Sequence, residues 1–119
     1  GITAVPPNKD IHRTALGATE SVAWEYVADT LSLIKKLKVA KIKVLAIEQA
    51  ENSTKLDTFQ PTKGETYAIV MGNEVKGVQQ EVVNASDLCI EIPQLGTKHS
   101  LNISVTTGVV LWDLFQKMQ

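Results

Sequence analysis

Short apolar runs that alternate with helix-like segments are the feature that most constrains the fold of this chain. The strand-like runs lie at residues 41–49, 66–72 and 87–93. Val44 to Ile47 are all apolar, as in a strand that is covered on both faces. Strands that alternate with helices predict a parallel sheet with helices packed against it. We therefore expect an α/β fold with a parallel sheet flanked by helices, in a single domain of 119 residues.

Two segments between these runs carry the signals of helices. Residues 29–40 begin with Asp29 or Thr30, either of which can cap a helix, and they end in lysines, which the helix dipole favours there. One face of this helix is apolar and consists of Leu31, Ile34 and Leu37. Residues 77–86 predict a second, shorter helix, and residues 51–65 predict a polar connection.

The last segment, residues 100–119, contains conflicting signals. Its many β-branched residues favour a strand, but its length is unusual for one. Ser100 is a plausible N-cap for a helix. Apolar residues recur at helical spacing, at Leu101, Val105, Val109, Trp112 and Phe115. We expect a helix that is buried on most sides.

Composition excludes several functional classes. A formal net charge of −1 gives no global signature of nucleic-acid binding, so any such binding requires a local patch. The single cysteine, Cys89, excludes an internal disulfide and an all-cysteine metal site. His12 and His99 are too isolated to indicate a metal site. The apolar runs are short for a membrane span and no signal peptide is visible, so we expect a cytoplasmic location with no metal and no membrane partner.

The residues after the three strand-like runs are the best candidates for a binding site. In parallel sheets, ligands bind beyond the carboxyl ends of the strands, which here carry residues 46–49, 71–77 and 92–96. Gly72 has no Cβ and would allow a ligand or another backbone to come close, although an ordinary strand-to-helix turn also explains it. Neither a Walker A loop nor a dinucleotide fingerprint is present, which disfavours phosphate cradling.

Two polar residues stand beside apolar ones in these loops. Asn102 and Glu74 would form a polar floor beside an apolar slot lined by Ile92 and Leu101, which suits a small molecule with a flat ring. The simpler alternative is that Asn102 is a second helix cap or satisfies a loop carbonyl.

The motifs of the second half of the chain resemble those of a known family. AIVMGNEVKGV and EVVNASDLCIEIPQLGTKHSLNISVTTGVVLWDLF are similar to the two carboxy-terminal motifs of the SpoU (TrmH-like) RNA ribose 2′-O-methyltransferases of the SPOUT superfamily. The family pattern is an apolar strand, G-x-E-x-x-G, a strand ending in Ile-Pro, and S-[LM]-N-[VIL]-S before a helix. IHRTALGATESVAW also resembles the family's intermediate segment, so the resemblance covers essentially the whole chain.

This resemblance implies a cofactor and a set of site residues. The family binds S-adenosylmethionine in a carboxy-terminal trefoil knot. The resemblance places the adenosyl group among Ile47, Gly72, Ile92 and Leu101, with Ser100 near the cofactor. Glu74 and Asn102 match the motif positions that organise the catalytic site. The family's enzymes are generally homodimers through the last helix, which makes Trp112, Phe115 and Met118 candidates for either the interface or the core.

One family motif is missing. The first motif, an Asn followed by a Gly and then an Arg, is not found, and the chain begins at Gly1 in the middle of a strand-like run. The sequence therefore predicts a SPOUT domain that lacks its amino-terminal strand-helix unit, roughly 40 residues by the usual size of a βαβ unit. Such a chain would bind the cofactor but transfer methyl groups poorly. Arg13 matches the family's basic residue and could contact RNA phosphate, or it could be a solvated charge.

The sequence leaves three functions open. The first is an S-adenosylmethionine-dependent tRNA or rRNA 2′-O-methyltransferase domain, and the second is a non-catalytic cofactor- or RNA-binding or dimerisation module of the same fold. The third, a flavodoxin-like nucleotide binder, is disfavoured by the missing phosphate fingerprint. Lysines near the predicted site are Lys9, Lys76 and Lys98. A second lysine cluster is better explained as a solvated helix face and comprises Lys35, Lys36, Lys38, Lys41 and Lys43.

Overall fold

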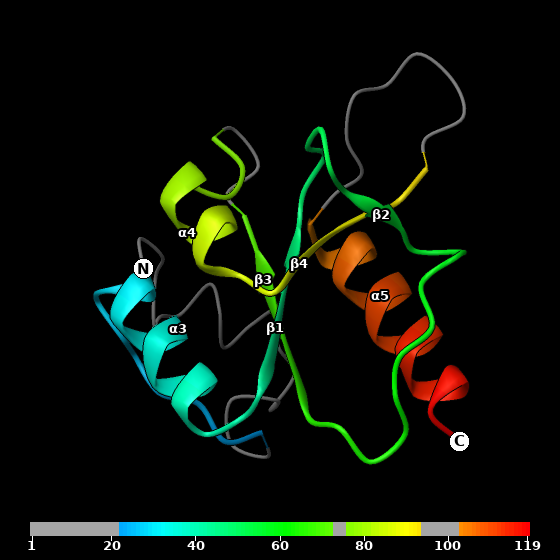
Figure 1. Ribbon diagram of the computed structural model, residues 1–119, viewed down its shortest axis with the longest axis horizontal. Coiled ribbons are helices and arrows are strands. Elements are labelled where there is room, and N and C mark those ends of the chain that lie inside the picture. Colours follow the sequence, from blue (N-terminus) through cyan, green and yellow to red (C-terminus); the bar gives the residue numbers. More distant parts are fainter. Residues whose placement is uncertain (1–21, 73–75, 94–102) are drawn as a thin grey trace, which may run out of the picture.

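The computed structural model describes residues 22–72, 76–93 and 103–119, and within them a parallel sheet lies between two layers of helices (Figure 1). The strands are β1 (Lys43–Ile47), β2 (Thr54–Lys55), β3 (Tyr67–Met71) and β4 (Leu88–Glu91). The helices are α3 (Thr30–Val39), α4 (Gln80–Ala85) and α5 (Ile103–Lys117). The strand order is β2-β4-β1-β3, and every pairing is parallel. The predicted α/β fold with a parallel sheet is therefore confirmed.

Strand β1 lies in the middle of the sheet and aligns its two neighbours. Ile47 stands opposite Met71 of β3 and Ile90 of β4, so the three strands end at the same level. Just before β4, Asp87 fixes the register: its carboxylate accepts a hydrogen bond of 2.7 Å from Val44 N–H, and its own N–H donates to the Val44 carbonyl at 2.8 Å. The carboxyl ends of the strands therefore share one edge of the sheet.

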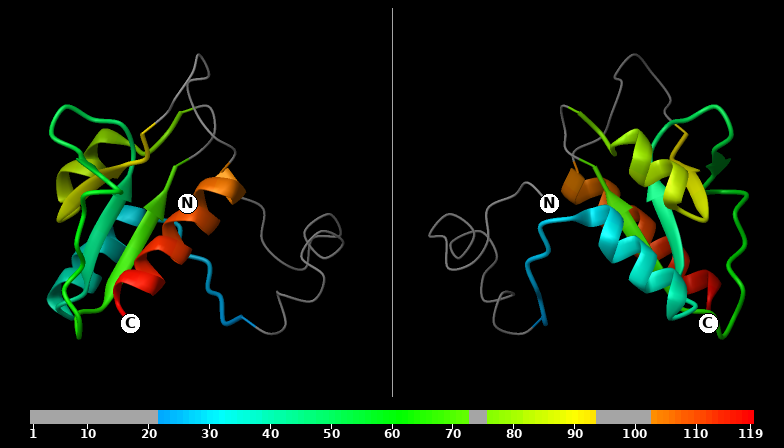
Figure 2. Two further views of the ribbon diagram at one scale, coloured as in Figure 1. Left: turned by 90° about the vertical axis from the view of Figure 1, so that its right-hand side faces the viewer. Right: turned by 60° about the vertical axis from the view of Figure 1, so that its left-hand side comes forward.

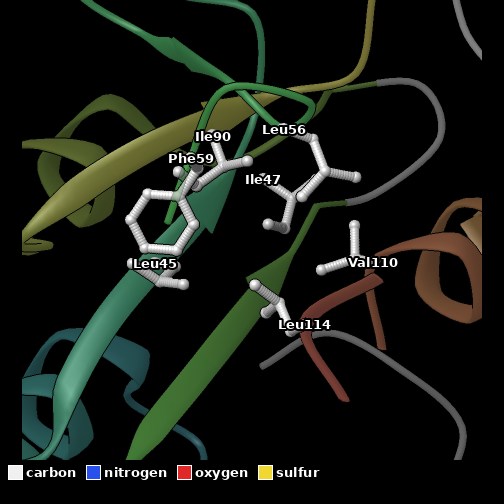
Figure 3. Packing of buried hydrophobic residues seen from close by; sticks show 7 residues of the cluster. All are labelled: Leu45, Ile47, Leu56, Phe59, Ile90, Val110 and Leu114. Carbon is white, nitrogen blue, oxygen red and sulfur yellow. The ribbon is translucent and has the colours of Figure 1, made fainter. Parts of the chain in front are cut away.

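Each face of the sheet has its own apolar cluster. On one face, Ile34 of α3 and Val82 of α4 pack with Val44 of β1. On the other face, α5 covers the sheet (Figure 2), and the cluster there consists of Leu45, Ile47, Leu56, Phe59, Ile90, Val110 and Leu114 (Figure 3). Strand β1 contributes to both clusters, which explains why four consecutive residues of it are buried.

The ends of helix α3 follow from local sequence. Asp29 is the N-cap, as one of the two predicted candidates, and its Oδ1 accepts hydrogen bonds from the N–H groups of Leu31 at 3.1 Å and Ser32 at 3.4 Å. At the other end Lys41 has a φ of 64°, and Ile42 N–H donates to the Leu37 carbonyl at 2.9 Å. This is the Schellman arrangement, in which glycine is the usual residue at the left-handed position.

Residues 51–65 are not only a polar connection, which corrects the prediction. They contain the short edge strand β2, and Leu56 and Phe59 are buried, with 5% and 8% of their surface exposed. Phe59 packs edge-to-face on Tyr67, with ring centroids 6.2 Å apart. Two apolar residues in a polar segment are too few to show the hydrophobic periodicity of a strand or helix, so the sequence did not indicate that the segment returns to the sheet. Strand β3 is half-buried, because it is the last strand in the sheet order.

Helix α5 is present, but the prediction that it is buried on most sides is wrong for this chain by itself. Of the residues of α5 that the structure describes, only Val110 and Leu114 are buried. The face predicted to be internal is exposed at Val105, Val109, Trp112 and Phe115, by 54%, 42%, 63% and 58%. The helix is apolar on several sides, so its spacing could not indicate which side meets the sheet.

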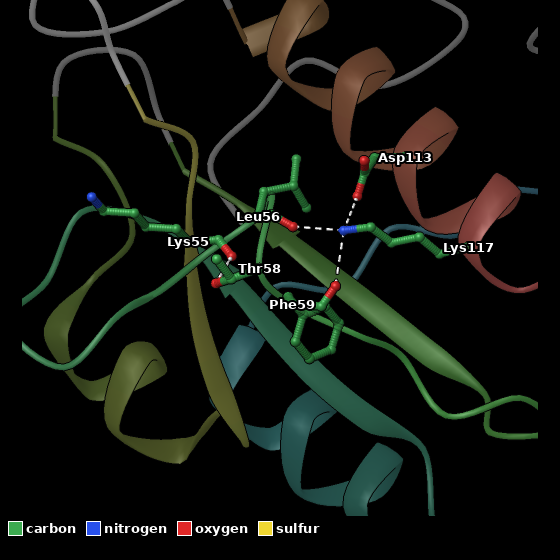
Figure 4. Close-up of polar contacts among 6 residues, drawn as sticks. All are labelled: Lys55, Leu56, Thr58, Phe59, Asp113 and Lys117. Atoms are coloured by element: carbon green, nitrogen blue, oxygen red, sulfur yellow. Dashed lines mark hydrogen bonds and ion pairs between the residues drawn. The ribbon is translucent and has the colours of Figure 1, made fainter.

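A lysine fastens the end of α5 to the segment that follows β2 (Figure 4). Lys117 Nζ donates to the carbonyls of Leu56 at 2.7 Å and Phe59 at 2.8 Å, and it pairs with Asp113 at 2.7 Å. These contacts lie beside the buried side chains of Leu56 and Phe59, so apolar and polar contacts hold the same segment. Among the described residues, no helix combines the length and apolarity needed to cross a membrane.

Candidate functional site

The carboxyl ends of β1, β3 and β4 come together, as the sequence predicted. The residues that follow them are Glu48, Gly72 and Ile92. Ile47, at the end of β1, pairs with Met71 and Ile90, and Glu48 N–H donates to the Ile90 carbonyl at 3.0 Å. The structure therefore brings residues that are far apart in the sequence together at one edge of the sheet, which is the candidate site.

Two glycines allow the backbone after β3 to close on itself. A Cβ at Gly72 would overlap the backbone of Gly77 and Val78. Gly77 has a φ of +68°, and a Cβ there would overlap the Glu48 carboxylate. Both positions therefore favour glycine, Gly72 because a Cβ has no space there and Gly77 because of its left-handed backbone conformation.

Glu48 is a site residue that the sequence reasoning did not single out. Its carboxylate is half-buried and accepts hydrogen bonds from two backbone N–H groups, that of Val78 at 2.8 Å and that of Gln49 at 3.0 Å. The available signal was an acidic residue directly after four buried residues of a central strand. Its partner Val78 lies 30 residues away, and no local pattern identifies it.

Cys89 also contacts this edge, through the backbone of Glu48. Its Sγ donates to the Glu48 carbonyl at 3.0 Å, and the residue is half-buried. Burial is the main reason why the pKa of the Cys89 thiol is raised above its ordinary value, and the carboxylates of Glu48 and Glu91 add to the effect. Burial therefore favours the neutral thiol, and Cys89 is a partly buried residue of β4 that lies outside the buried core.

The structure places some of the predicted site residues and not others. Ile47 is buried, Ile92 is partly buried against the same apolar cluster, and Gly72 directly follows the neighbouring strand β3. The other predicted residues lie outside the described residues and are Arg13, Glu74, Ser100, Leu101 and Asn102. Within residues 22–72, 76–93 and 103–119, no group of three or more His, Cys, Asp or Glu could hold a metal ion.

Comparison with known proteins identifies the family. Residues 2–112 match the family model described as the SpoU rRNA Methylase family, and the chain belongs to this family. It is 30% identical over 104 residues to a 23S rRNA (guanosine-2′-O-)-methyltransferase of Neisseria meningitidis, with 87% of this chain and 40% of the relative covered. It is 31% identical over 96 residues to a tRNA (guanosine(18)-2′-O)-methyltransferase of Aquifex aeolicus, with 76% and 43% covered. The chain thus spans less than half the length of these relatives.

Solved structures show the same fold. An AdoMet-bound rRNA methyltransferase from Sinorhizobium meliloti superposes with a TM-score of 0.90 and 26% identity, over all of this chain and 44% of that one. The A. aeolicus TrmH/SpoU tRNA modifying enzyme superposes with a TM-score of 0.80 and 26% identity, over 89% of this chain and 53% of that one. Both agree with the α/β arrangement of helices on a parallel sheet.

Proposed function

We propose that this chain is the catalytic domain, or a large part of it, of an S-adenosylmethionine-dependent RNA ribose 2′-O-methyltransferase. The observation that carries the proposal is the meeting of Ile47, Gly72 and Ile92 at one edge of the sheet, in a chain of the SpoU rRNA Methylase family. Relatives named as methyltransferases of guanosine in tRNA and in 23S rRNA support an RNA substrate.

The described residues at this edge fit the cofactor. Ile47 and Ile92 provide apolar surface for an adenine ring, and Gly72 allows close approach because it has no side chain. When bound, S-adenosylmethionine supplies a methyl group activated by its sulfonium charge. The AdoMet-bound relative from S. meliloti, which covers the whole chain, supports the same cofactor.

We assign roles to the remaining motif residues by their match to the family pattern. Ser100 and Leu101 would contact the adenosyl group, and Glu74 and Asn102 would orient the ribose and the residues around it. The ribose 2′ hydroxyl is a poor nucleophile until its proton is shared or removed, so a placed acceptor is needed beside it. Arg13 would contact an RNA phosphate, which would make RNA affinity fall as salt rises.

Three structural properties belong to the same proposal. The carboxy-terminal segment threads into a trefoil knot, as the resemblance of the Ser-Leu-Asn-Ile-Ser element at residues 100–104 to the family motif implies. Two copies pair through α5, whose apolar face is exposed in the single chain. The enzyme acts in the cytoplasm, without a metal and without a membrane partner.

Calorimetric titration with S-adenosylhomocysteine, the product form of the cofactor, tests the proposal. The wild-type chain is expected to bind it saturably, and Leu101→Arg is expected to abolish binding because a charge would enter the apolar slot. Val39→Arg is a matched control, since Val39 is 86% exposed and ends α3 next to the amino edge of the sheet.

A second measurement separates enzyme from binding module. Transfer of radioactive methyl groups to tRNA or rRNA, lost in Asn102→Ala, would support catalysis. Binding of S-adenosylhomocysteine without methyl transfer to any RNA tested would fit the non-catalytic module and also a catalytic domain that needs the missing first motif; restored transfer after adding that motif would distinguish them in favour of the enzyme. A folded wild-type chain that binds no S-adenosylhomocysteine would contradict both.

A further inference from the structure

Glu48 connects the carboxyl ends of β1, β3 and β4. Through its backbone it is bound to β4: its N–H donates to the Ile90 carbonyl at 3.0 Å, and its carbonyl accepts from Cys89 Sγ at 3.0 Å. Through its side chain it is bound to the segment after β3, because the carboxylate accepts from Val78 N–H at 2.8 Å.

The carboxylate also fixes the direction in which the chain leaves β1. Its second oxygen accepts from the N–H of Gln49, the next residue, at 3.0 Å. Each carboxylate oxygen therefore has one backbone donor. An amide in the same place offers a single acceptor oxygen and two donors, so it could satisfy only one of these N–H groups and would turn a donor toward the other.

The segment that Glu48 holds is the one that meets Gly72. Gly77 and Val78 lie so close to Gly72 that a Cβ on Gly72 would overlap them, and Gly77 also packs against the Glu48 carboxylate. The position of Gly72 at the edge of the predicted pocket therefore depends on contacts that end at Glu48.

We propose that Glu48 is a positioning residue of the cofactor site: its carboxylate holds the Gly77–Val78 backbone against Gly72 and so sets the shape of the pocket wall next to Ile47. The inference rests on the proposed function for the identity of the ligand. It assigns Glu48 no contact with the cofactor and no part in the chemical step.

The test uses the full chain and the isosteric variant Glu48→Gln, with S-adenosylhomocysteine as the probe. At a temperature where circular dichroism shows both proteins to be folded, the variant is expected to bind roughly tenfold more weakly or worse, the usual effect of losing a hydrogen bond to a charged group. Glu51→Gln is the matched control, because Glu51 is an exposed acid three residues further along the same loop, and its affinity is expected to equal that of the wild type.

A second measurement does not depend on cofactor binding. Amide hydrogen exchange, followed by NMR, is expected to accelerate at Val78 in Glu48→Gln and to stay unchanged at Leu45 in the buried centre of β1. A residue that only stabilised the fold would instead change exchange across the sheet. Glu48→Asp is a further variant, since it keeps the charge but shortens the reach toward Val78.

The outcomes separate this inference from the proposed function. If Glu48→Gln binds S-adenosylhomocysteine as tightly as the wild type, the positioning role is overturned, whatever the hydrogen-exchange data show. If the wild-type chain binds no S-adenosylhomocysteine, the proposed function fails, and the exchange rate of Val78 decides the role of Glu48 in holding the loop. Failure of both Glu48 variants to fold would assign the residue to stability alone and would also overturn the inference.

Discussion

At the scale of single residues, the carboxyl edge of the sheet depends on side chains that are small or precisely matched to backbone groups. Gly72 and Gly77 let two stretches of backbone meet, and the Glu48 carboxylate accepts hydrogen bonds from the N–H groups of Val78 and Gln49. Ile47 and Ile92, the apolar residues that we propose to line the cofactor site, belong at the same time to the cluster under α5. The site and the core are therefore continuous, and changes at the edge are expected to affect both binding and stability.

Cys89 gives a pH-dependent prediction at this scale. Burial raises the folded-state pKa of its thiol above the ordinary value of 9.0, so at pH 8 the folded protein contains less reactive thiolate than the unfolded chain. Alkylation by iodoacetamide is expected to be slower in the native protein than in urea. The stability that the neutral thiol contributes is present below pH 9 and is lost as the pH rises through the raised folded-state pKa. Equal alkylation rates in the native and unfolded states at pH 8 would contradict this account.

At the scale of elements, a helix or strand could be predicted when the residues that determine it lie close together in the sequence. Helix α3 was predictable because its cap, its apolar face and its terminal lysines all lie within about a dozen residues. Strand β1 was predictable from its continuous apolar run. Strand β2 was missed because its pairing with β4 is fixed by contacts such as that of Leu56 N–H with the Glu91 carbonyl, 35 residues away by number. The buried side of α5 was missed because apolar residues lie on several of its faces.

For the candidate site too, the sequence predicted some features and not others. The convergence of the three strand ends followed from the alternation of strands and helices, and the sheet confirms it. The roles of Glu74 and Asn102 came from motif resemblance and stay predictions. Glu48 could not be recognised from the sequence, because its function in the structure is defined by a backbone N–H that has no side-chain signature.

The end of α3 gives a prediction at the scale of elements. Lys41 occupies the left-handed position of the Schellman turn, where a Cβ is unfavourable and glycine is not. Lys41→Gly is expected to increase the free energy of unfolding by about 1 kcal/mol, measured by urea denaturation. Lys41→Ala is the control, because it removes the charge but keeps the Cβ, and it is expected to leave stability within about 0.5 kcal/mol of the wild type. A stabilisation by alanine equal to that by glycine would show that charge, not conformation, is responsible.

At the scale of the whole molecule, α5 presents a surface that the single chain does not use. Trp112 and Phe115 stack with ring centroids 5.9 Å apart, and both are more than half exposed, as is Val105. The opposite side of the same helix is held by Val110, Leu114 and Lys117. An exposed aromatic pair on a helix that is already fastened to its own sheet is typical of an interface, and it supports the proposed pairing of two copies through α5.

This pairing predicts a dimer that a charge on α5 disrupts. Sedimentation equilibrium is expected to show a dimer for the wild-type chain, and Trp112→Glu is expected to weaken it by at least about 2 kcal/mol, or roughly thirtyfold, because aromatic residues carry much of the energy of such interfaces. Val39→Glu is the control, since Val39 is equally apolar and 86% exposed but lies at the end of α3. Circular dichroism should show both variants folded, because neither side chain is part of the described core. A wild-type chain that is monomeric at high micromolar concentration, or a dimer unaffected by Trp112→Glu, would mean that α5 presents this face to something other than a second copy.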